Sequence, residues 1–219
     1  MGNEQSARGA RRDVELVPQS QPVAAVSASY CRPTPSQFQV THQIVTPSRF
    51  TVCDVSTGLV CFHKEKRKAL STRQTLVDVR DDNVHVGVAN AKKDTFKSSF
   101  SVLSGDSKDP EDELFQVYAK DQLSSSELHV DFKDIITGER CLMGLKGHWR
   151  RHKAYIWLDR GATGAREPVA KVWPHEKVPQ TEVYTLEIAQ NVDVALVLML
   201  CMILDERWRK SISYNERQS

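Results

Sequence analysis

The sequence predicts a mostly β protein of the α+β class: a closed antiparallel barrel of about twelve strands around a buried C-terminal helix. Three observations lead to this prediction. One is an unbroken apolar run near the C-terminus, and the second is a series of short strand-like segments separated by turns. The third is the number of residues available to build those strands.

The apolar run, Val194–Leu204, has eleven consecutive positions without a polar side chain. Leu and Met predominate and neither Gly nor Pro interrupts it, so a helix is favoured over a strand. A surface helix carries a polar face opposite its apolar stripe, and this segment has none, which predicts burial on every side. Asp193 stands at the N-cap position. A membrane span needs about 20 apolar residues, so burial inside the protein is favoured over a transmembrane helix.

Residues 47–190 contain short runs of β-branched and aromatic residues bounded by turn formers. The expected strands are Phe50–Val55, Leu59–Phe62, Thr75–Arg80, Val84–Val88, Thr95–Val102, Leu114–Ala119, Glu127–Phe132, Arg140–Leu145, Ala154–Leu158, Pro168–Trp173 and Glu182–Ile188. At about 12 residues per strand and turn, these 144 residues supply about twelve strands. A sandwich cannot enclose a helix, whereas a barrel of about eleven or more strands can. An open sheet with the helix on one face would require a polar helix face, which is missing.

Composition describes an ordinary globular protein, with a net charge of +2 and 40% hydrophobic residues. The expected organisation is a disordered tail over residues 1–46, a barrel domain over 47–212 and a short tail over 213–219. The five cysteines form no CxxC pair, which favours free thiols in a reducing, intracellular setting.

The first six residues, MGNEQS, match the N-myristoylation signal, with Gly2 as the acceptor. Arg8, Arg11 and Arg12 follow closely and suit an anionic membrane surface. The alternative is an accidental match on a disordered tail. We expect the signal to be used, giving a cytoplasmic lipoprotein that is peripheral on the inner face of the plasma membrane.

Several segments resemble the LURP-one-related family. NVDVALVLMLCMILDE resembles the C-terminal helix of that family, RFTVCDVSTGLVCF its opening hairpin and ALSTRQTLVDVRDDNVHVGV its second hairpin. CLMGLKGHWRRHKAYIWL and REPVAKVW resemble the strands before the helix, and Asn191 stands where the family usually has a glycine. The resemblance covers roughly residues 47–210. It implies a twelve-stranded barrel around the helix, which is the fold of the tubby C-terminal domain. A similar fold is proposed for phospholipid scramblases. The resemblance does not imply an enzyme.

Motifs of catalysis and metal binding are missing from the sequence: there is no GxSxG, phosphate-binding glycine loop, HExxH or zinc spacing. We therefore expect no catalytic residues, metal or cofactor. His148 and His152 are interpreted as surface residues. The acidic loop 106–113 lacks the spacing of a calcium-binding EF-hand and is interpreted as a solvated loop.

Two basic clusters are the candidate lipid-binding sites, each with a net charge of +4 over residues 63–73 and 146–153. The predicted contacts are Lys64, Lys66, Arg67, Lys68, Lys146, Arg150, Arg151 and Lys153. A solvated barrel rim is the alternative for either cluster alone, and the resemblance to tubby, which binds phosphoinositides, favours anionic lipid. Nucleic-acid binding is not expected, because the pI of about 8.3 is modest and the sequence contains no nucleic-acid recognition motif. A soluble protein-interaction or regulatory module is the alternative function, and lipid scrambling is a third.

Overall fold

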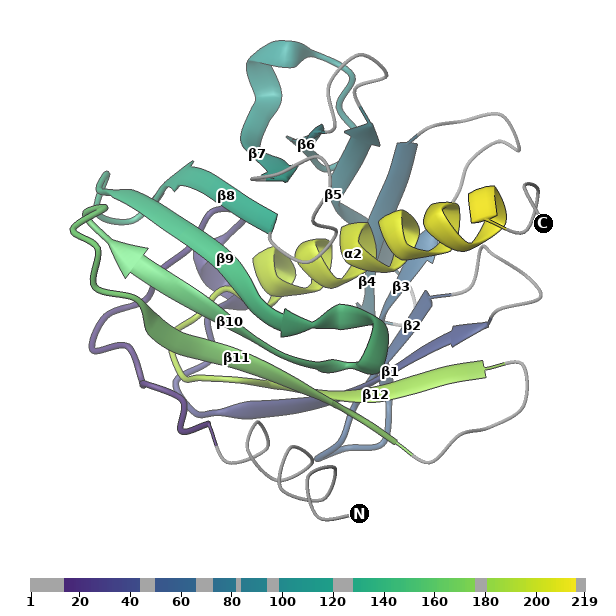
Figure 1. Cartoon of the computed structure of the whole chain (residues 1–219). Coiled ribbons are helices and arrows are strands. Elements are labelled where there is room, and N and C mark those ends of the chain that lie inside the picture. The colour runs from purple at the N-terminus through teal and green to yellow at the C-terminus, as the bar shows by residue number, and fades with distance from the viewer. Residues whose placement is uncertain are drawn as a thin grey trace.

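The computed structural model describes residues 14–43, 50–65, 73–81, 84–93, 99–119, 128–175 and 181–215. Over these residues, twelve antiparallel strands close into one barrel, and helix α2 (Val194–Asn215) runs through it (Figure 1). Each strand pairs with its neighbours in sequence, and β1 closes the barrel against β12. The prediction of a barrel around a C-terminal helix is confirmed.

The strands are β1 (Ser36–Gln43), β2 (Phe50–Asp54), β3 (Val60–Glu65), β4 (Arg73–Asp81), β5 (Val84–Lys93), β6 (Ser99–Ser104), β7 (Glu113–Ala119), β8 (Leu128–Lys133), β9 (Arg140–His148), β10 (Lys153–Arg160), β11 (Glu167–Pro174) and β12 (Thr181–Ile188). Three short 3₁₀ helices are η1 (Ala28–Tyr30), η2 (Pro110–Asp112) and η3 (Trp149–Arg151).

Helix α2 is buried on all sides over its apolar run. Every side chain from Val194 to Leu204 is at most 3% exposed. Strand residues in the same buried cluster include Phe38, Val40, Val52, Val102, Val117, Val130, Met143 and Leu186. Burying each large aliphatic side chain contributes about 1.5–3 kcal/mol, so the helix and the barrel depend on each other for stability.

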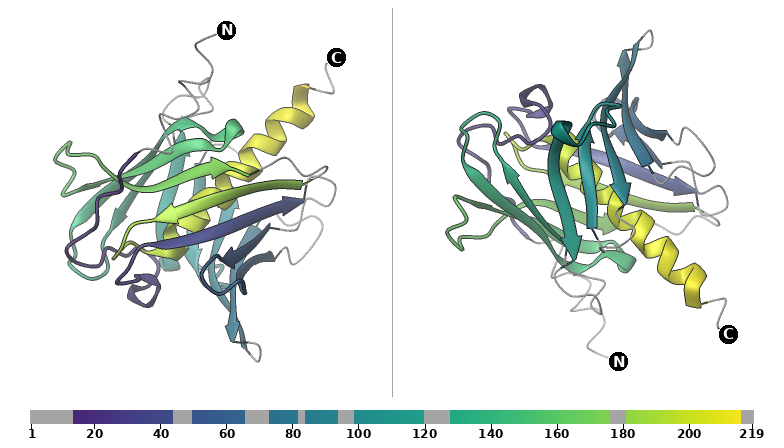
Figure 2. Two further views of the ribbon diagram at one scale, coloured as in Figure 1. Left: turned by 90° about the horizontal axis from the view of Figure 1, so that it is seen from below. Right: turned by 90° about the horizontal axis from the view of Figure 1, so that it is seen from above.

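The N-terminal boundary of the barrel differs from the prediction. Strand β1 lies inside the segment 1–46, and residues 14–35 form an arm across the end of the barrel where α2 begins (Figure 2). The assignment of a disordered tail is therefore wrong for residues 14–43. The arm has few large apolar side chains, but it buries Val23, Ala24 and Ala25 and its backbone N–H groups find buried acceptors.

Two turns at this same end, residues 54–59 and 134–139, share one geometry. In each, the leading aspartate accepts a hydrogen bond from the backbone N–H two positions later, at 2.9 and 3.2 Å. The glycines Gly58 and Gly138 have φ of +72° and +77° and donate to the carbonyl oxygen of the aspartate at 2.8 Å. Positive φ favours glycine, which explains the shared D-x-x-T-G sequence.

Candidate functional site

The two ends of the barrel are different. The closed end, where α2 begins, is covered by the arm. At the other end α2 extends beyond the strands (Figure 2). Because consecutive strands alternate in direction, the β3–β4 and β9–β10 connections both lie at this second end. We call it the rim and define it by the last residues of β3, the first residues of β4, residues 146–153 and the C-terminal end of α2.

The predicted lipid-binding residues are distributed unevenly over the rim. Lys146 and Arg151 are exposed, Lys153 is half-buried, and Lys64 is only 7% exposed. Lys64 therefore does not fit the prediction of a surface contact. Outside the described residues lie Gly2, Lys66, Arg67 and Lys68, together with the side chain of Arg150.

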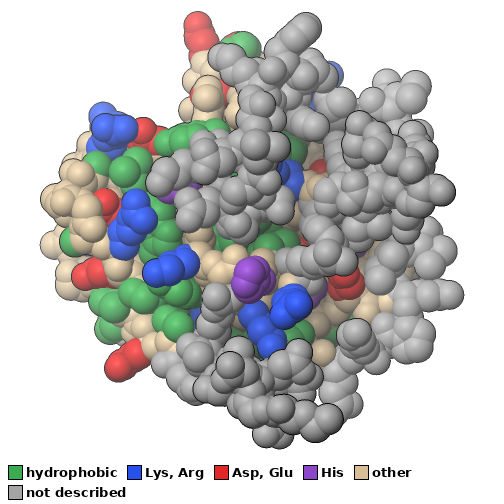
Figure 3. Space-filling view, viewed as in Figure 1, with side chains coloured by type: hydrophobic (Ala, Val, Ile, Leu, Met, Phe, Trp, Pro, Cys, Tyr) green, Lys and Arg blue, Asp and Glu red, His purple; other side chains and the backbone are tan. Residues whose placement is uncertain are grey.

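Strands β3 and β9, which lead into the two basic clusters, finish at the same end of the barrel. Strands β3 and β9 are separated by five strands in either direction around the barrel, so their ends lie on opposite sides of the rim. Figure 3 shows described Lys and Arg side chains interspersed with hydrophobic ones on the face that it views. Among the described residues of the rim, the exposed basic side chains are those of Lys146 and Arg151.

A buried polar network connects the rim to α2. The Asp205 carboxylate is 3% exposed and accepts hydrogen bonds from Trp149 Nε1 at 2.8 Å and from the Tyr184 hydroxyl at 3.2 Å. The His152 ring stacks on Tyr184 with 4.4 Å between centroids, and His42 Nδ1 lies 3.7 Å from Asp205 Oδ2. The network positions η3, and with it Arg151, against α2. The sequence interpretation of His152 as a surface residue is wrong, since it is 8% exposed.

Burial sets the charge states in this network. It lowers the pKa of His152 to about 4, so the imidazole is neutral at neutral pH. Burial, followed by the charge of Asp205, raises the pKa of the Tyr184 hydroxyl. One signal in the sequence points to this network: Asp205 is the first charged residue after the apolar run. A charge at that depth needs hydrogen-bond donors.

The closed end is held by Asp193, the predicted N-cap. Its Oδ1 accepts from the N–H groups of Ala195 and Leu196 at 2.9 and 3.2 Å. Its Oδ2 accepts from three successive N–H groups of the arm, residues 25–27, at 2.8–3.2 Å. Burial raises the pKa of this carboxyl to about 6, while these backbone N–H groups act in the opposite direction. Asn191, two residues earlier, has φ +61°, a conformation in which asparagine commonly replaces glycine.

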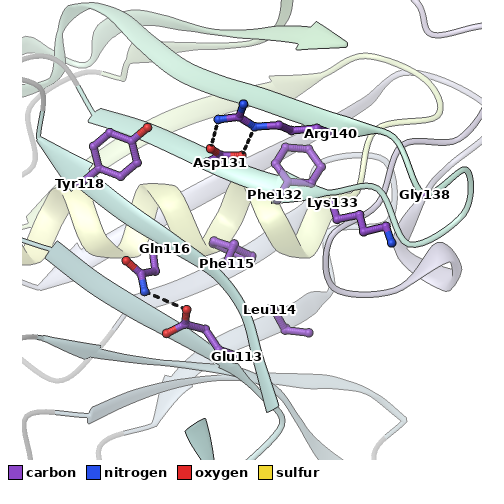
Figure 4. A pocket seen from close by; sticks show the side chains of 10 residues that line it. All are labelled: Glu113, Leu114, Phe115, Gln116, Tyr118, Asp131, Phe132, Lys133, Gly138 and Arg140. Atoms are coloured by element: carbon purple, nitrogen blue, oxygen red, sulfur yellow. Dashed lines mark hydrogen bonds and ion pairs between the residues drawn. The ribbon is translucent and has the colours of Figure 1, made fainter. Parts of the chain in front are cut away.

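An open groove of about 600 Å³ lies over β7, β8 and β9 (Figure 4). Arg140 donates from Nε and Nη2 to the Asp131 carboxylate, and Gln116 donates to Glu113 at 2.9 Å. These four side chains pair with one another, and Tyr118 and Lys133 also line the groove.

We next consider metal ligands, reactive cysteines and membrane-spanning helices among the described residues. They contain no group of three or more His, Cys, Asp or Glu side chains placed to hold a metal ion. Burial raises the pKa of Cys31 and Cys61 to about 12, so both are protonated and poorly nucleophilic. Of the helices in this part of the chain, none has both the length and the hydrophobicity required to cross a bilayer.

A closed antiparallel barrel enclosing one apolar C-terminal helix defines the class of this protein. The sequence model of the LURP-one-related family matches residues 37–205, and the chain belongs to that family. It is 22% identical over 188 residues to protein LURP-one-related 10 of Arabidopsis thaliana, covering 84% of this chain and 96% of that protein. Protein LURP-one-related 15 of the same plant is 23% identical over 184 residues, covering 83% and 84%.

One solved structure, an X-ray structure of an Arabidopsis thaliana protein, has a similar fold. The TM-score is 0.59 at 20% identity, covering 84% of this chain and 97% of the other. At that identity the likeness concerns the fold alone.

Proposed function

We propose that this chain is a non-enzymatic peripheral membrane protein that binds anionic lipid headgroups, phosphoinositides among them, through its rim. The supporting observation is that the exposed side chains of Lys146 and Arg151 lie at the end of the barrel from which α2 emerges. A flat anionic surface placed against the rim meets Lys146 and Arg151. In this proposal the basic residues between β3 and β4 contact the same surface. Each Lys or Arg near such a surface contributes about 1 kcal/mol.

An acyl chain on Gly2 supplies the second signal in this proposal. A single myristoyl chain binds membranes only marginally, with a partition constant on the order of 10⁴ M⁻¹. The Val14 carbonyl accepts a hydrogen bond from Lys171 Nζ at 3.0 Å, which fixes where the preceding segment leaves the barrel. Thirteen residues span at most about 45 Å, and an eight-residue strand rises only about 27 Å. Gly2 can therefore reach the plane of the rim, and the proposed location is the inner face of the plasma membrane.

Vesicle flotation of the unmyristoylated chain tests the role of the rim. We expect flotation with phosphatidylcholine vesicles that contain a bisphosphorylated phosphoinositide, and little without it. The Lys146→Glu/Arg151→Glu variant should bind at least tenfold more weakly, with the difference reduced at high salt. The matched control is Lys108→Glu/Lys133→Glu, which makes the same charge change with exposed residues near the closed end. Equal flotation of the two double variants would contradict the proposal.

A protein-interaction module remains the second candidate, favoured by one observation at the closed end. The two D-x-x-T-G turns carry four exposed apolar side chains: Val55 (51%), Leu59 (69%), Ile135 (54%) and Ile136 (44%). Exposed apolar side chains held on structured turns suit protein contacts. Absence of flotation with any anionic vesicle would favour this function over lipid binding.

A further inference from the structure

We infer that a pocket near the closed end binds a small carboxylate with an apolar body. The pocket has a volume of about 590 Å³, within the range of small-molecule sites, and lies between the arm and strands β2, β3 and β4. Two guanidinium groups, Arg32 from the arm and Arg80 from β4, line it together with apolar side chains. It is separate from the basic residues of the rim.

Arg32 is held in place while most of its hydrogen-bond donors stay unused. Its Nη1 donates to Asp54 Oδ2 at 2.5 Å, and its guanidinium carbon lies 4.9 Å from the centroid of the Phe38 ring. Arginine has five N–H donors. Among the described residues, Asp54 is the acceptor for one of those on Arg32, so the others are available to an anion in the pocket.

Arg80 has a similar arrangement on the other side of the pocket. Its Nε and Nη2 donate to the Asp78 carboxylate at 3.0 and 2.6 Å, which leaves Nη1 without an acceptor in the described part of the chain. Its guanidinium carbon lies 5.3 and 5.6 Å from the ring centroids of Tyr30 and Phe62. Stacking and ion pairing together fix the orientation of the guanidinium group before any ligand arrives, which lowers the entropy cost of binding.

The remaining walls and the charge balance define the class of ligand. Apolar surface comes from Leu59, Val60, Cys61 and Val79, and Thr57 and His63 add polar groups to the lining. The two arginines are balanced by Asp54 and Asp78, so the local charge disfavours a polyphosphate, and a monoanion would be held by the remaining guanidinium N–H donors. The guanidinium fork matches the two oxygens of a carboxylate. An aliphatic or aromatic monocarboxylate meets these requirements.

Calorimetry of the full chain with soluble probes tests this inference. Octanoate is expected to bind, with octan-1-ol and acetate each at least tenfold weaker, because each lacks one half of the recognised chemistry. Arg32→Gln and Arg80→Gln should each weaken octanoate about tenfold. Arg140→Gln is the matched control, since it removes another ion-paired arginine outside the pocket and should leave octanoate affinity unchanged. Leu59→Gln alters an exposed side chain, so it should fold normally and weaken octanoate several-fold.

Four outcomes would overturn the inference: no octanoate binding, equal binding of octan-1-ol, unchanged affinity in both pocket arginine variants, or tighter binding of octyl phosphate than of octanoate. The last would assign the pocket to phosphate groups, including those of lipids. The Lys146→Glu/Arg151→Glu variant should keep its octanoate affinity while losing vesicle binding, so failure of the lipid-binding proposal and failure of this one are distinguishable.

Discussion

At the scale of single residues, buried polar side chains determine how the ends of the barrel are held. His152 ends η3 in the left-handed region, with φ of 45°, and its ring is packed between Trp149 and Tyr184. A histidine in an apolar environment resists protonation, so this position connects the stability of the fold to pH.

Stability should therefore fall in mild acid through His152. Its pKa is about 4 in the folded protein against about 6.5 when unfolded. The unfolded state takes up the proton first as pH falls from about 6.5 to 4, so the contribution of His152 to the free energy of unfolding drops through that window. Asparagine tolerates positive φ and does not titrate. We therefore expect His152→Asn to reduce the change in the free energy of unfolding between pH 7 and pH 4.5 by about 2 kcal/mol.

Urea unfolding at the two pH values measures this difference. The control is His148→Asn, which removes an exposed histidine four positions earlier. It should show the same change in unfolding free energy between the two pH values as the wild type. If His152→Asn shows the same change in unfolding free energy as the wild type, His152 is not responsible for the loss of stability in acid.

The sequence predicts only part of what such residues do. Asp193 is identifiable as an N-cap because capping is local: the carboxylate serves N–H groups two and three positions later. Its contacts with the arm join residues 166 to 168 positions apart, and nothing in the local pattern indicates them. The local sequence does not indicate the site of Arg32 and Arg80 either, because the pocket forms only when the arm lies against β3 and β4.

At the scale of elements, strand β1 shows where pattern reading fails. Its sequence, SQFQVTHQ, alternates Phe38 and Val40 with polar residues and follows Pro33 and Pro35, so it resembles an unstructured linker. Pairing with both β2 and β12 makes it a strand. The other strands carry denser β-branched and aromatic runs and were predictable within a few residues.

The arm and α2 are stabilised by the same carboxylate, which makes Asp193→Asn a test of both elements. The amide keeps the size of the side chain but has only one acceptor oxygen, and its NH₂ group would face backbone N–H donors. We expect a loss of about 2–4 kcal/mol in the free energy of unfolding, with the arm becoming sensitive to protease.

Asp109→Asn is the matched control, because Asp109 caps the exposed helix η2 through a single N–H bond from Glu111. It should cost less than about 1 kcal/mol. Similar losses in the two variants would mean that the contacts of Asp193 with the arm add nothing to stability.

At the scale of the whole molecule, strand alternation places the two proposed binding sites at opposite ends of the barrel. It gathers the basic connections at the rim and the D-x-x-T-G turns at the closed end, where the arm completes the pocket of Arg32 and Arg80. The sequence predicts the number of strands, and alternation then assigns each connection to an end. It does not predict that Lys64 is buried, because that depends on packing around the rim.

Hydrogen–deuterium exchange of the full chain on phosphoinositide vesicles tests most directly whether the rim faces the membrane. We expect slower exchange on vesicles in residues 146–153, with no change in the turns 54–59 and 134–139 at the closed end. Protection of those turns with unchanged exchange at residues 146–153 would contradict it, because the opposite end of the barrel would then be in contact with the lipid.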